Sequence, residues 1–568
     1  MSPNLKTALS LTSALMLIGC NAGDTKGPSS INASSNDYCI SGGTIYTARD
    51  QNPTVDVVAV ENGEITYAGD KKEGWCKTDT ANQLDLKGGA IYPGLTDGHG
   101  HLIGIGLREM TLNLEGTKSI KDLQDKLHQA VNDAPGDETL YGRGWIETHW
   151  PEERFPTRQD LDAVAPDRPI ILERADGHAY VVNSVVLERA EITGSTADPF
   201  GGAINKDAQG QPTGMLIDNA GKLVEDQLPQ LTRERRREAY IKGAELYASR
   251  GWTNIHSMSV DPNDVGLLQE LAASGEIKIR VYNSLDVQSD RALDTMGPES
   301  NAEHELITTR AIKLYADGAL GSRGAALLEP YSDDPDNEGL MTLKEVQVEA
   351  FLETALRNGI QVNTHAIGDR ANRYVLQWYK NAFDTVQKSN WKVKDPRWRI
   401  EHSQIINVDD IPFFAAYDVL PSMQPSHAIG DLHFAVARLG KKRLAGGYAW
   451  RSLIDSGVRI VGGTDAPVEV GDPRIEIYAA TQRKDLTGYS NENWYENEKV
   501  TPQEALKMLT AWPAYGAFEE NKVGTIEVGK RADFSAFKTD MLTVDGPDIL
   551  TSEPLFTMVD GVMAYQAD

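Results

Sequence analysis

Cysteine, positive charge and long apolar segments are all scarce in this chain of 568 residues. The chain has three cysteines, and its 83 acidic residues outnumber the 56 basic ones, which gives a net charge of −27. Such a surface repels polyanions, so we expect no nucleic-acid partner. Beyond the N-terminus, no segment approaches the roughly 20 apolar residues of a membrane-spanning helix. A phosphate-binding glycine loop of the P-loop type is also absent.

What is present is an ordinary globular composition. Hydrophobic residues make up 40% of the chain and charged residues 24%, with 51 glycines and 26 prolines. These values exclude disordered, collagen-like and coiled-coil proteins. The length predicts two to four domains, or one large barrel with additions.

The first 19 residues have the features of an export signal. Lys6 supplies a positive charge, and Thr7–Ile18 is a mostly apolar run of twelve residues, too short to cross a bilayer. The run ends in Leu17-Ile18-Gly19-Cys20, which resembles a bacterial lipobox. The alternative is an ordinary signal peptide with a cysteine there by chance.

The lipobox resemblance implies cleavage after residue 19 and a lipidated Cys20, followed by a flexible polar tether over residues 20–37. We therefore expect a lipoprotein of the cell envelope, with its catalytic part outside the cytoplasm and membrane contact only through the lipid. Cys39 and Cys76 would then meet an oxidising compartment, so we expect a disulfide between them; two buried free thiols are the alternative. A disulfide would leave no thiol nucleophile.

Both ends of the remaining chain are rich in short strands. Residues 38–92 contain several, with Asn62-Gly63 as a hairpin turn signal, and residues 520–568 have a similar pattern. We expect one small β-domain assembled from the two ends, with two independent end caps as the alternative.

Residues 93–519 alternate strands and amphipathic helices, which predicts a parallel sheet or barrel. Eight strands can be placed, and eight such units predict a (β/α)₈ barrel. The strands are predicted at Ile91–Leu95, Thr253–His256, Ile277–Leu285, Ala311–Tyr315, Ile360–Thr364, Trp398–Ile400, Val419–Ser422 and Arg459–Gly462. The gap after the first strand is far longer than one βα unit, so we expect a large insertion at about residues 110–240.

Histidines and an aspartate follow the predicted barrel strands. His99 and His101 are two residues apart, so on a strand they share one face and can meet one ion. His365, His402 and Asp465 each end a later strand. Barrel enzymes place their sites at these C-terminal strand ends, and nitrogen and oxygen ligands together describe a metal site.

Lys313 lies inside the apolar strand Ala311–Tyr315. An isolated buried ammonium is costly, so this lysine needs an explanation. One is a side chain that extends to the barrel rim. The other is a lowered pKa that lets carbon dioxide carboxylate the amine, giving an anionic ligand able to bridge two metals.

These residues occur in segments that resemble amidohydrolase family 3 of the metal-dependent amidohydrolase superfamily, whose members are similar to N-substituted formamide deformylase. The segments are Asp97-Gly98-His99-Gly100-His101, Ala316-Asp317-Gly318-Ala319-Leu320-Gly321-Ser322-Arg323, Asn363-Thr364-His365-Ala366-Ile367-Gly368-Asp369-Arg370, Arg399-Ile400-Glu401-His402-Ser403-Gln404 and Gly463-Thr464-Asp465-Ala466-Pro467. The resemblance covers nearly all of the chain after the tether. It implies the barrel, its insertion and a composite β-sandwich of both ends.

The resemblance also assigns roles to the candidate residues. It makes Lys313 an N6-carboxylated bridge and Asp465 both a ligand and the general base and acid. One or two divalent metals are implied, with zinc expected; a single-metal site with a structural Lys313 stays open. The implied ligands are His99, His101, Lys313, His365, His402 and Asp465.

Four further residues are expected at the substrate. Trp145 and His178 lie in insertion segments that resemble parts of the family reaching the active site, and His178 would act as a catalytic hydrogen-bond donor. Arg323 would bind an anionic group and His427 would line the pocket. The alternatives are packing within the insertion for Trp145 and His178, a surface ion pair for Arg323, and packing for His427.

We therefore expect a hydrolase that cleaves a C–N amide-type bond of a small molecule with a metal-activated water. The first alternative is an ester, lactone or cyclic amide cleaved at the same site. The second is an inactive surface binding lipoprotein, against which all six ligand positions are filled. The sequence leaves a homodimer open.

Overall fold

The computed structural model describes residues 37–76, 81–133, 136–148, 150–287, 293, 296–297, 305–491 and 494–567. All of them belong to the second of two compact units, residues 36–568. The predicted signal peptide and Cys20 lie outside the described residues. No helix within the described ranges has the length and apolar character needed to cross a membrane.

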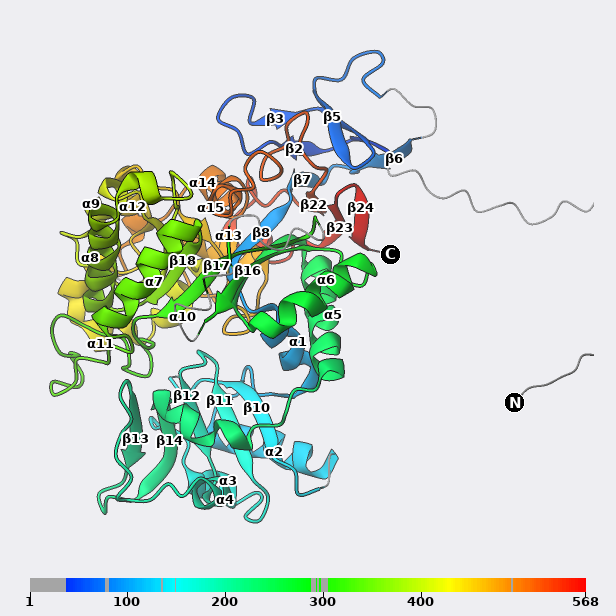
Figure 1. Cartoon of the computed structure of the whole chain (residues 1–568). Helices are drawn as coiled ribbons and strands as arrows, with labels where there is room; N and C mark the ends of the chain where they lie inside the picture. The colour runs from blue at the N-terminus through cyan, green and yellow to red at the C-terminus, as the bar shows by residue number, and fades with distance from the viewer. Residues whose placement is uncertain are drawn as a thin grey trace, which may run out of the picture. The chain divides into compact units, whose positions relative to one another are not determined.

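Eight parallel strands form the centre of this unit and close nearly into a barrel (Figure 1). Neighbouring strands in the sheet follow the order of the sequence, from β8 to β15 and onward to β21. The first and last strands meet, because Asp465 N donates to His99 O at 2.6 Å. The strands are β8 (Leu95–Gly100), β15 (Trp252–Val260), β16 (Arg280–Asp286), β17 (Ile307–Tyr315), β18 (Gln361–Ala366), β19 (Arg399–His402), β20 (Leu420–Met423) and β21 (Val461–Gly462).

Each of the eight predicted strands overlaps one of these, so the predicted α/β barrel is confirmed in outline. The first prediction joined two strands: Ile91–Leu95 spans the end of β7 (Ala90–Pro93) and the start of β8. Gly94 separates them, and a side chain there would lie 2.3 Å from Thr253 Oγ1. The close approach of this point of the chain to β15 therefore requires glycine.

Alternation along the strands sorts side chains between the helices and the barrel interior. In β17, Ile312 and Leu314 pack in the main hydrophobic core with the helices, whereas Lys313 points inward. Glycine caps end two helices just before strands: Gly251 (φ 102°) precedes β15 and Gly359 (φ 73°) precedes β18.

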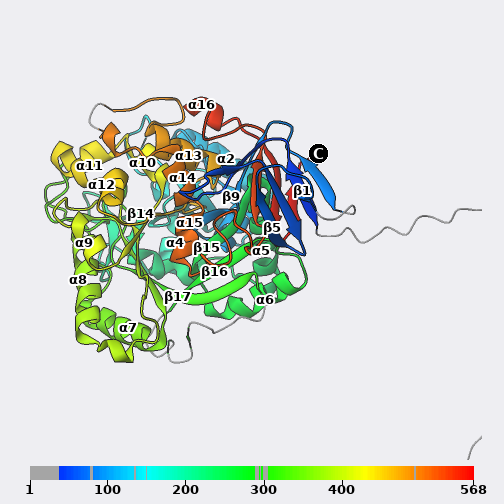
Figure 2. The same cartoon turned by 90° about the horizontal axis from the view of Figure 1, so that it is seen from above.

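Helices cover the outer face of the sheet, with α7 and α8 beside β17 and β18 in Figures 1 and 2. The helices of the barrel are α1 (Leu102–Met110), α5 (Arg233–Arg250), α6 (Val265–Ala273), α7 (Glu345–Asn358), α8 (Asp369–Thr385), α9 (Ile411–Ala416), α10 (Pro425–Asp431), α11 (Ala435–Arg443), α12 (Trp450–Asp455), α13 (Pro473–Gln482), α14 (Pro502–Met508) and α15 (Ala511–Gly516).

A separate six-stranded sheet lies in the sequence between β8 and β15, within the region expected to hold an insertion. Its strand order is β13-β14-β12-β11-β10-β9, and only β10 pairs in parallel with its neighbours. Its elements are β9 (Leu112–Asn113), α2 (Ile120–Asp133), β10 (Leu140–Trp145), α3 (Arg158–Asp162), β11 (Ile170–Arg174), β12 (Ala179–Val182), α4 (Ser184–Arg189), β13 (Gly202–Lys206) and β14 (Pro212–Asp218).

Two sheets at the chain ends share one hydrophobic core. The four-stranded sheet is N-terminal, whereas the six-stranded sheet pairs N-terminal β7 with C-terminal β22, so blue and red strands lie together in Figure 2. Ile40, Ile91, Phe534 and Met558 meet in this core. The remaining strands are β1 (Tyr38–Ser41), β2 (Thr44–Tyr46), β3 (Thr54–Val55), β4 (Val57–Glu61), β5 (Glu64–Gly69), β6 (Asn82–Asp85), β22 (Phe534–Phe537), β23 (Pro554–Val559) and β24 (Val562–Gln566).

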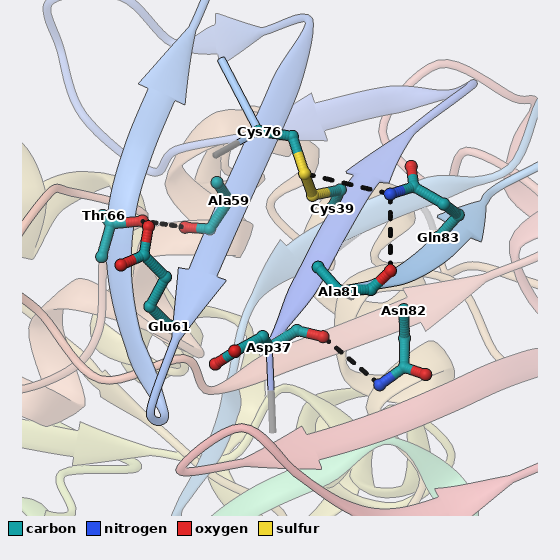
Figure 3. Close-up of a disulfide and its surroundings, with 9 residues drawn as sticks. All are labelled: Asp37, Cys39, Ala59, Glu61, Thr66, Cys76, Ala81, Asn82 and Gln83. Atoms are coloured by element: carbon teal, nitrogen blue, oxygen red, sulfur yellow. Dashed lines mark hydrogen bonds between the residues drawn. A yellow bond between two sulfur atoms is a disulfide. The ribbon is translucent and has the colours of Figure 1, made fainter. Parts of the chain in front are cut away.

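A disulfide joins Cys39 on β1 to Cys76, which follows β5 (Figure 3). The Cα atoms are 5.9 Å apart, within the usual range for a bridged pair. The side chain of Gln83 on β6 lies beside the sulfur atoms. The bridge therefore connects the segment that follows the edge strand β5 to the inner strand β1 of the same sheet.

Candidate metal centre

Three side chains at the C-terminal end of the barrel form a group able to hold a metal ion. His99 on β8, His402 on β19 and Asp465 just after β21 offer ligand atoms that all lie within 4.8 Å of one another. All three are buried, with at most 6% of each residue exposed. Two of them, His402 (φ 72°) and Asp465 (φ 61°), have the left-handed backbone that non-glycine residues seldom adopt and that is enriched at functional sites.

Hydrogen bonds fix which ring nitrogens face this group. His99 Nδ1 donates to Glu401 Oε2 at 2.5 Å, and His402 Nδ1 donates to Gln424 Oε1 at 2.8 Å. Both imidazoles therefore keep Nε2 unprotonated and available, the arrangement found around metal-ligating histidines. The donor set of two nitrogens and one carboxylate fits zinc or a similar divalent ion.

The structure brings two more predicted ligands beside the group. His101 Nε2 is 3.1 Å from Asp465 Oδ1, and its Nδ1 donates to Met258 O at 3.1 Å. The ring of His365 lies 4.5 Å from that of His402, centroid to centroid. His365 Nε2 is 3.4 Å from Gly318 O and can donate its hydrogen there. The unprotonated Nδ1 is then the nitrogen that can bind a metal ion.

Lys313 reaches the same place from β17. Its Nζ lies 3.4 Å from His99 Nε2, and the residue is 2% exposed. Burial lowers the pKa of Lys313 to about 8, although the Glu401 and Asp465 carboxylates favour the charged form. Among the described residues, no carboxylate lies within ion-pairing distance of the ammonium; Glu401 and Asp465 pair with other side chains.

Asp465 is at the centre of these contacts. Its Oδ1 is 3.4 Å from His99 Nε2, and its Oδ2 is 3.6 Å from His427 Nε2. Burial alone would raise the pKa of Asp465, but its histidine neighbours, His99 first and then His101, hold it well below its usual range. The carboxylate is therefore ionised and able to bind a cation.

His178 reaches the cavity from the insertion. Its Nδ1 donates to Asp218 Oδ1 at 2.7 Å, and its ring lies 5.0 Å from that of His365. Burial by itself would lower the pKa of His178, but the hydrogen bond and charge of Asp218 outweigh it and raise the pKa to about 8. His178 is thus held as a hydrogen-bond donor next to the ligand group.

Of the other candidate residues, some line the cavity and others do not. His427 on α10 lines the cavity. Trp145 does not: it is fully buried in the core of the insertion, and its Nε1 donates to Leu172 O at 3.1 Å. Its neighbours Gly144 and Ile146 line the cavity in its place, because successive strand residues face opposite sides.

Arg323 is also outside the cavity. Its guanidinium forms an ion pair with Asp333 at 3.0 Å, which matches the surface-pair alternative. Arg174 does line the cavity, as do Arg108 and Arg143. Arg174 is the last residue of β11, whereas Arg323 lies in the loop after β17, and no pattern in the sequence shows that only Arg174 of these two faces the cavity.

The cavity beside the ligand group has a volume of about 260 Å³. Loops after the barrel strands and after two insertion strands contribute to its wall, which is polar in many places. Charged residues of the wall that the sequence analysis missed are Arg108, Glu115, Arg143, Arg174, Asp176, Asp431 and Glu469.

Comparisons with known proteins agree with this site. A family model described as the amidohydrolase family matches residues 83–565. The chain is 32% identical over 533 residues to the Bacillus subtilis (strain 168) protein YtcJ, named as an amidohydrolase, with 92% of this chain and 98% of that protein covered. It is 25% identical over 545 residues to the N-substituted formamide deformylase of Arthrobacter pascens, covering 93% and 98%.

A solved structure is similar over nearly the whole chain. It is an uncharacterized metal-dependent hydrolase from Pyrococcus horikoshii OT3, with a TM-score of 0.70 and 26% identity, covering 90% of this chain and 99% of that one. Fold, ligand geometry and sequence similarity agree, and the chain belongs to the amidohydrolase family.

Proposed function

We propose that this hydrolase cleaves the C–N bond of an amide-type small molecule by a metal-assisted attack of water. The observation that carries the proposal is the group His99, His402 and Asp465, with ligand atoms within 4.8 Å of one another beside a cavity that His402 and Asp465 line. A bound divalent cation would polarise the scissile carbonyl and make a nearby water more acidic.

The chain's own residues supply the remaining steps. Asp465 is placed to accept a proton from the attacking water and to pass it to the leaving amine. His178, held by Asp218, is placed to donate a hydrogen bond to the carbonyl oxygen as negative charge develops there.

Lys313 is proposed to be carboxylated on Nζ, as the family resemblance implies. Charge supports this: an ammonium 3.4 Å from His99 Nε2 would repel a cation at the site, whereas a carbamate would add two anionic oxygens. With His101 and His365 beside the group, six donors suffice for two ions. A site with one ion and a free Lys313 is the alternative.

Two alternatives to amide cleavage remain. An ester, lactone or cyclic amide could react at the same site, because the fold alone does not select the bond. An inactive binding protein is disfavoured by the filled ligand positions. The deformylase of Arthrobacter pascens favours an amide-type bond for this chain as well.

The test is metal content together with hydrolysis. Protein beginning at residue 38 would be analysed for bound metal as expressed, with and without Lys313→Ala, and assayed on N-acyl and N-formyl amines. About two equivalents of zinc that fall with Lys313→Ala would support the carbamate. One equivalent, unchanged by the substitution, would favour a single ion. Absence of hydrolysis after zinc is restored would contradict the proposed function.

The location is proposed from the lipobox alone: a lipoprotein of the cell envelope, anchored through Cys20, with a small-molecule substrate. Labelling of cells with a radioactive fatty acid tests it. Cys20→Ala would abolish both the label and membrane association. A protein that stays labelled without Cys20 would contradict the anchor.

A further inference from the structure

Four carboxylates line the cavity besides Asp465. Glu115 lies 3.9 Å from Arg108, and the other three are Asp176, Asp431 and Glu469. Asp176 follows β11 of the insertion, Asp431 ends α10, and Glu469 lies in the loop after β21. Three distant segments thus place acidic side chains on one small cavity. Whether this charge is available to a ligand depends on the cations nearby.

Two arginines of the wall are already neutralised. Arg174 is 1% exposed, pairs with Asp176, and its Nε donates to Glu147 Oε2 at 2.8 Å. Arg143 lies 3.6 Å from Glu173. Because these arginines have carboxylate partners of their own, only Asp176 of the three cavity acids is compensated.

Arg108 compensates neither of the other two acids. Its terminal nitrogens donate to the backbone oxygens of Glu469 and Val470 at 3.0 and 3.2 Å, and its Nε donates to Glu109 at 3.1 Å. The arginine therefore holds the backbone of the loop and does not pair with the Glu469 carboxylate.

Among the described residues, no arginine or lysine therefore forms an ion pair with Asp431 or Glu469, although Arg174 still favours the ionised form of Asp431 from a distance. Asp431 accepts hydrogen bonds from Gln404 Nε2 and Tyr448 OH, both at 2.5 Å. The Glu469 carboxylate has no hydrogen-bond partner in the part of the chain that the structure describes, and its Oε1 lies 3.9 Å from His427 Nε2.

His427 provides independent evidence of a missing ligand. The residue is only 9% exposed, lines the cavity, and its Nε2 finds no hydrogen-bond partner among the described residues. It lies between the two ends of the cavity, with Nε2 3.6 Å from Asp465 Oδ2 and 3.9 Å from Glu469 Oε1. Buried polar atoms are seldom left unpaired unless something else binds there.

We infer that Asp431 and Glu469 form a subsite for a cationic group, an amine or guanidine carried by the substrate of the proposed amide hydrolysis. Burial raises the pKa of Asp431 to about 7 and, with repulsion from Asp431, that of Glu469 to about 8. A bound cation would keep both ionised. His427 lies between Asp465 and Glu469, and this separation fits a substrate with a short aliphatic chain between its cationic group and its amide.

Three acetamides of equal length test the inference. Mono-N-acetyl-1,4-diaminobutane is cationic, N-pentylacetamide is neutral and 5-acetamidopentanoate is anionic. With zinc-loaded protein we expect kcat/KM for the cationic compound to exceed that of the neutral one by roughly tenfold to a hundredfold. Equal values for the cationic and neutral compounds would overturn the subsite while leaving the proposed function intact.

Variants localise the preference. Glu469→Gln and Asp431→Asn should each remove most of the advantage of the cationic compound and leave the neutral one nearly unchanged, whereas Glu469→Lys should favour the anionic one. The matched control is Glu338→Gln, an exposed carboxylate paired with Arg370 away from the cavity. A cationic preference that survives all three cavity variants would contradict the assignment.

Binding without chemistry separates the subsite from the reaction. Calorimetry with butylammonium, butanol and butyrate should show preferential binding of butylammonium that Glu469→Gln weakens. If no acetamide is hydrolysed but this preference is present, the subsite stands and the amide function fails. If butylammonium binds no better than butanol, the subsite is rejected whatever the hydrolysis shows.

Discussion

His99 and Glu401 are joined by a 2.5 Å hydrogen bond between two fully buried side chains. Glu401 in turn forms an ion pair with Arg399, Nε to Oε1 at 2.8 Å, and Arg399 is also fully buried. The carboxylate therefore serves two partners: it neutralises Arg399 and it fixes the proton of His99 on Nδ1. Only the second task concerns the metal directly.

Glu401→Gln should lower zinc affinity by about 10–100-fold, because the amide no longer fixes the His99 tautomer or raises its basicity. Competition with a chelator of known affinity measures this. The same substitution leaves Arg399 without its anion and should reduce the free energy of unfolding by about 3–5 kcal/mol. Circular dichroism at the assay temperature checks that the variant stays folded. Unchanged zinc affinity in folded protein would show that Glu401 serves only Arg399.

His178→Ala should reduce kcat by about 10²–10³-fold and leave zinc content unchanged, because it removes a donor to the developing charge but no ligand. Asp218→Asn should act in the same direction more weakly, since the ring stays but loses its orienting carboxylate. Steady-state kinetics and elemental analysis on both variants provide the measurements. Loss of zinc in His178→Ala would instead make His178 a ligand.

The barrel could be predicted because its buried parallel strands are apolar runs with helices between them. β17 begins at residue 307, four residues before the prediction, because its polar start gives no apolar signal. Candidate ligands such as His365 could be proposed because each lies at or just after the end of a strand. Trp145 and Arg323 were expected at the substrate but lie outside the cavity wall. The sequence shows where a strand ends, but it does not show toward which side the residues near that end face.

No pattern in the sequence could have predicted the acidic wall of the cavity. Asp176, Asp431 and Glu469 belong to three segments that only the tertiary structure brings together. The role of Glu401 at the site could have been suspected, because it directly precedes the candidate ligand His402. Its ion pair with Arg399, however, gives it an equally good structural explanation. Spacing in the sequence identifies residues that share one helix or strand, whereas a cavity is lined by residues from many elements.

Asp560→Asn should destabilise the contact between barrel strand β16 and the terminal sheets. Asp560 pairs with Arg280 and Arg531; burial alone would raise its pKa, but these arginines lower it. We expect a loss of about 1.5–3 kcal/mol in the free energy of unfolding at pH 7. Denaturant titration measures the loss.

The pH dependence has a definite sign. A lowered folded-state pKa contributes stability above the unfolded value of about 3.9, and this contribution disappears as the pH falls through the folded pKa. The difference between wild type and Asp560→Asn should therefore be constant from pH 7 to 5 and shrink below about 3.9. Glu553→Gln, an exposed surface pair with Lys538, should leave stability almost unchanged. A difference that grows with acid would contradict the ion-pair explanation.

Reduction of the Cys39–Cys76 disulfide should destabilise the terminal sheets without touching the metal centre. The 37-residue separation corresponds to about 4 kcal/mol of loop-closure entropy in the unfolded chain. Both cysteines belong to the N-terminal segment, whereas every candidate ligand belongs to the barrel. Thermal unfolding with and without reductant measures the effect, and Cys39→Ala combined with Cys76→Ala is the control in which reductant should change nothing. Wild-type protein that unfolds at the same temperature in both conditions would show that the bridge does not stabilise the fold, and loss of zinc on reduction would show that the sheets and the site are coupled.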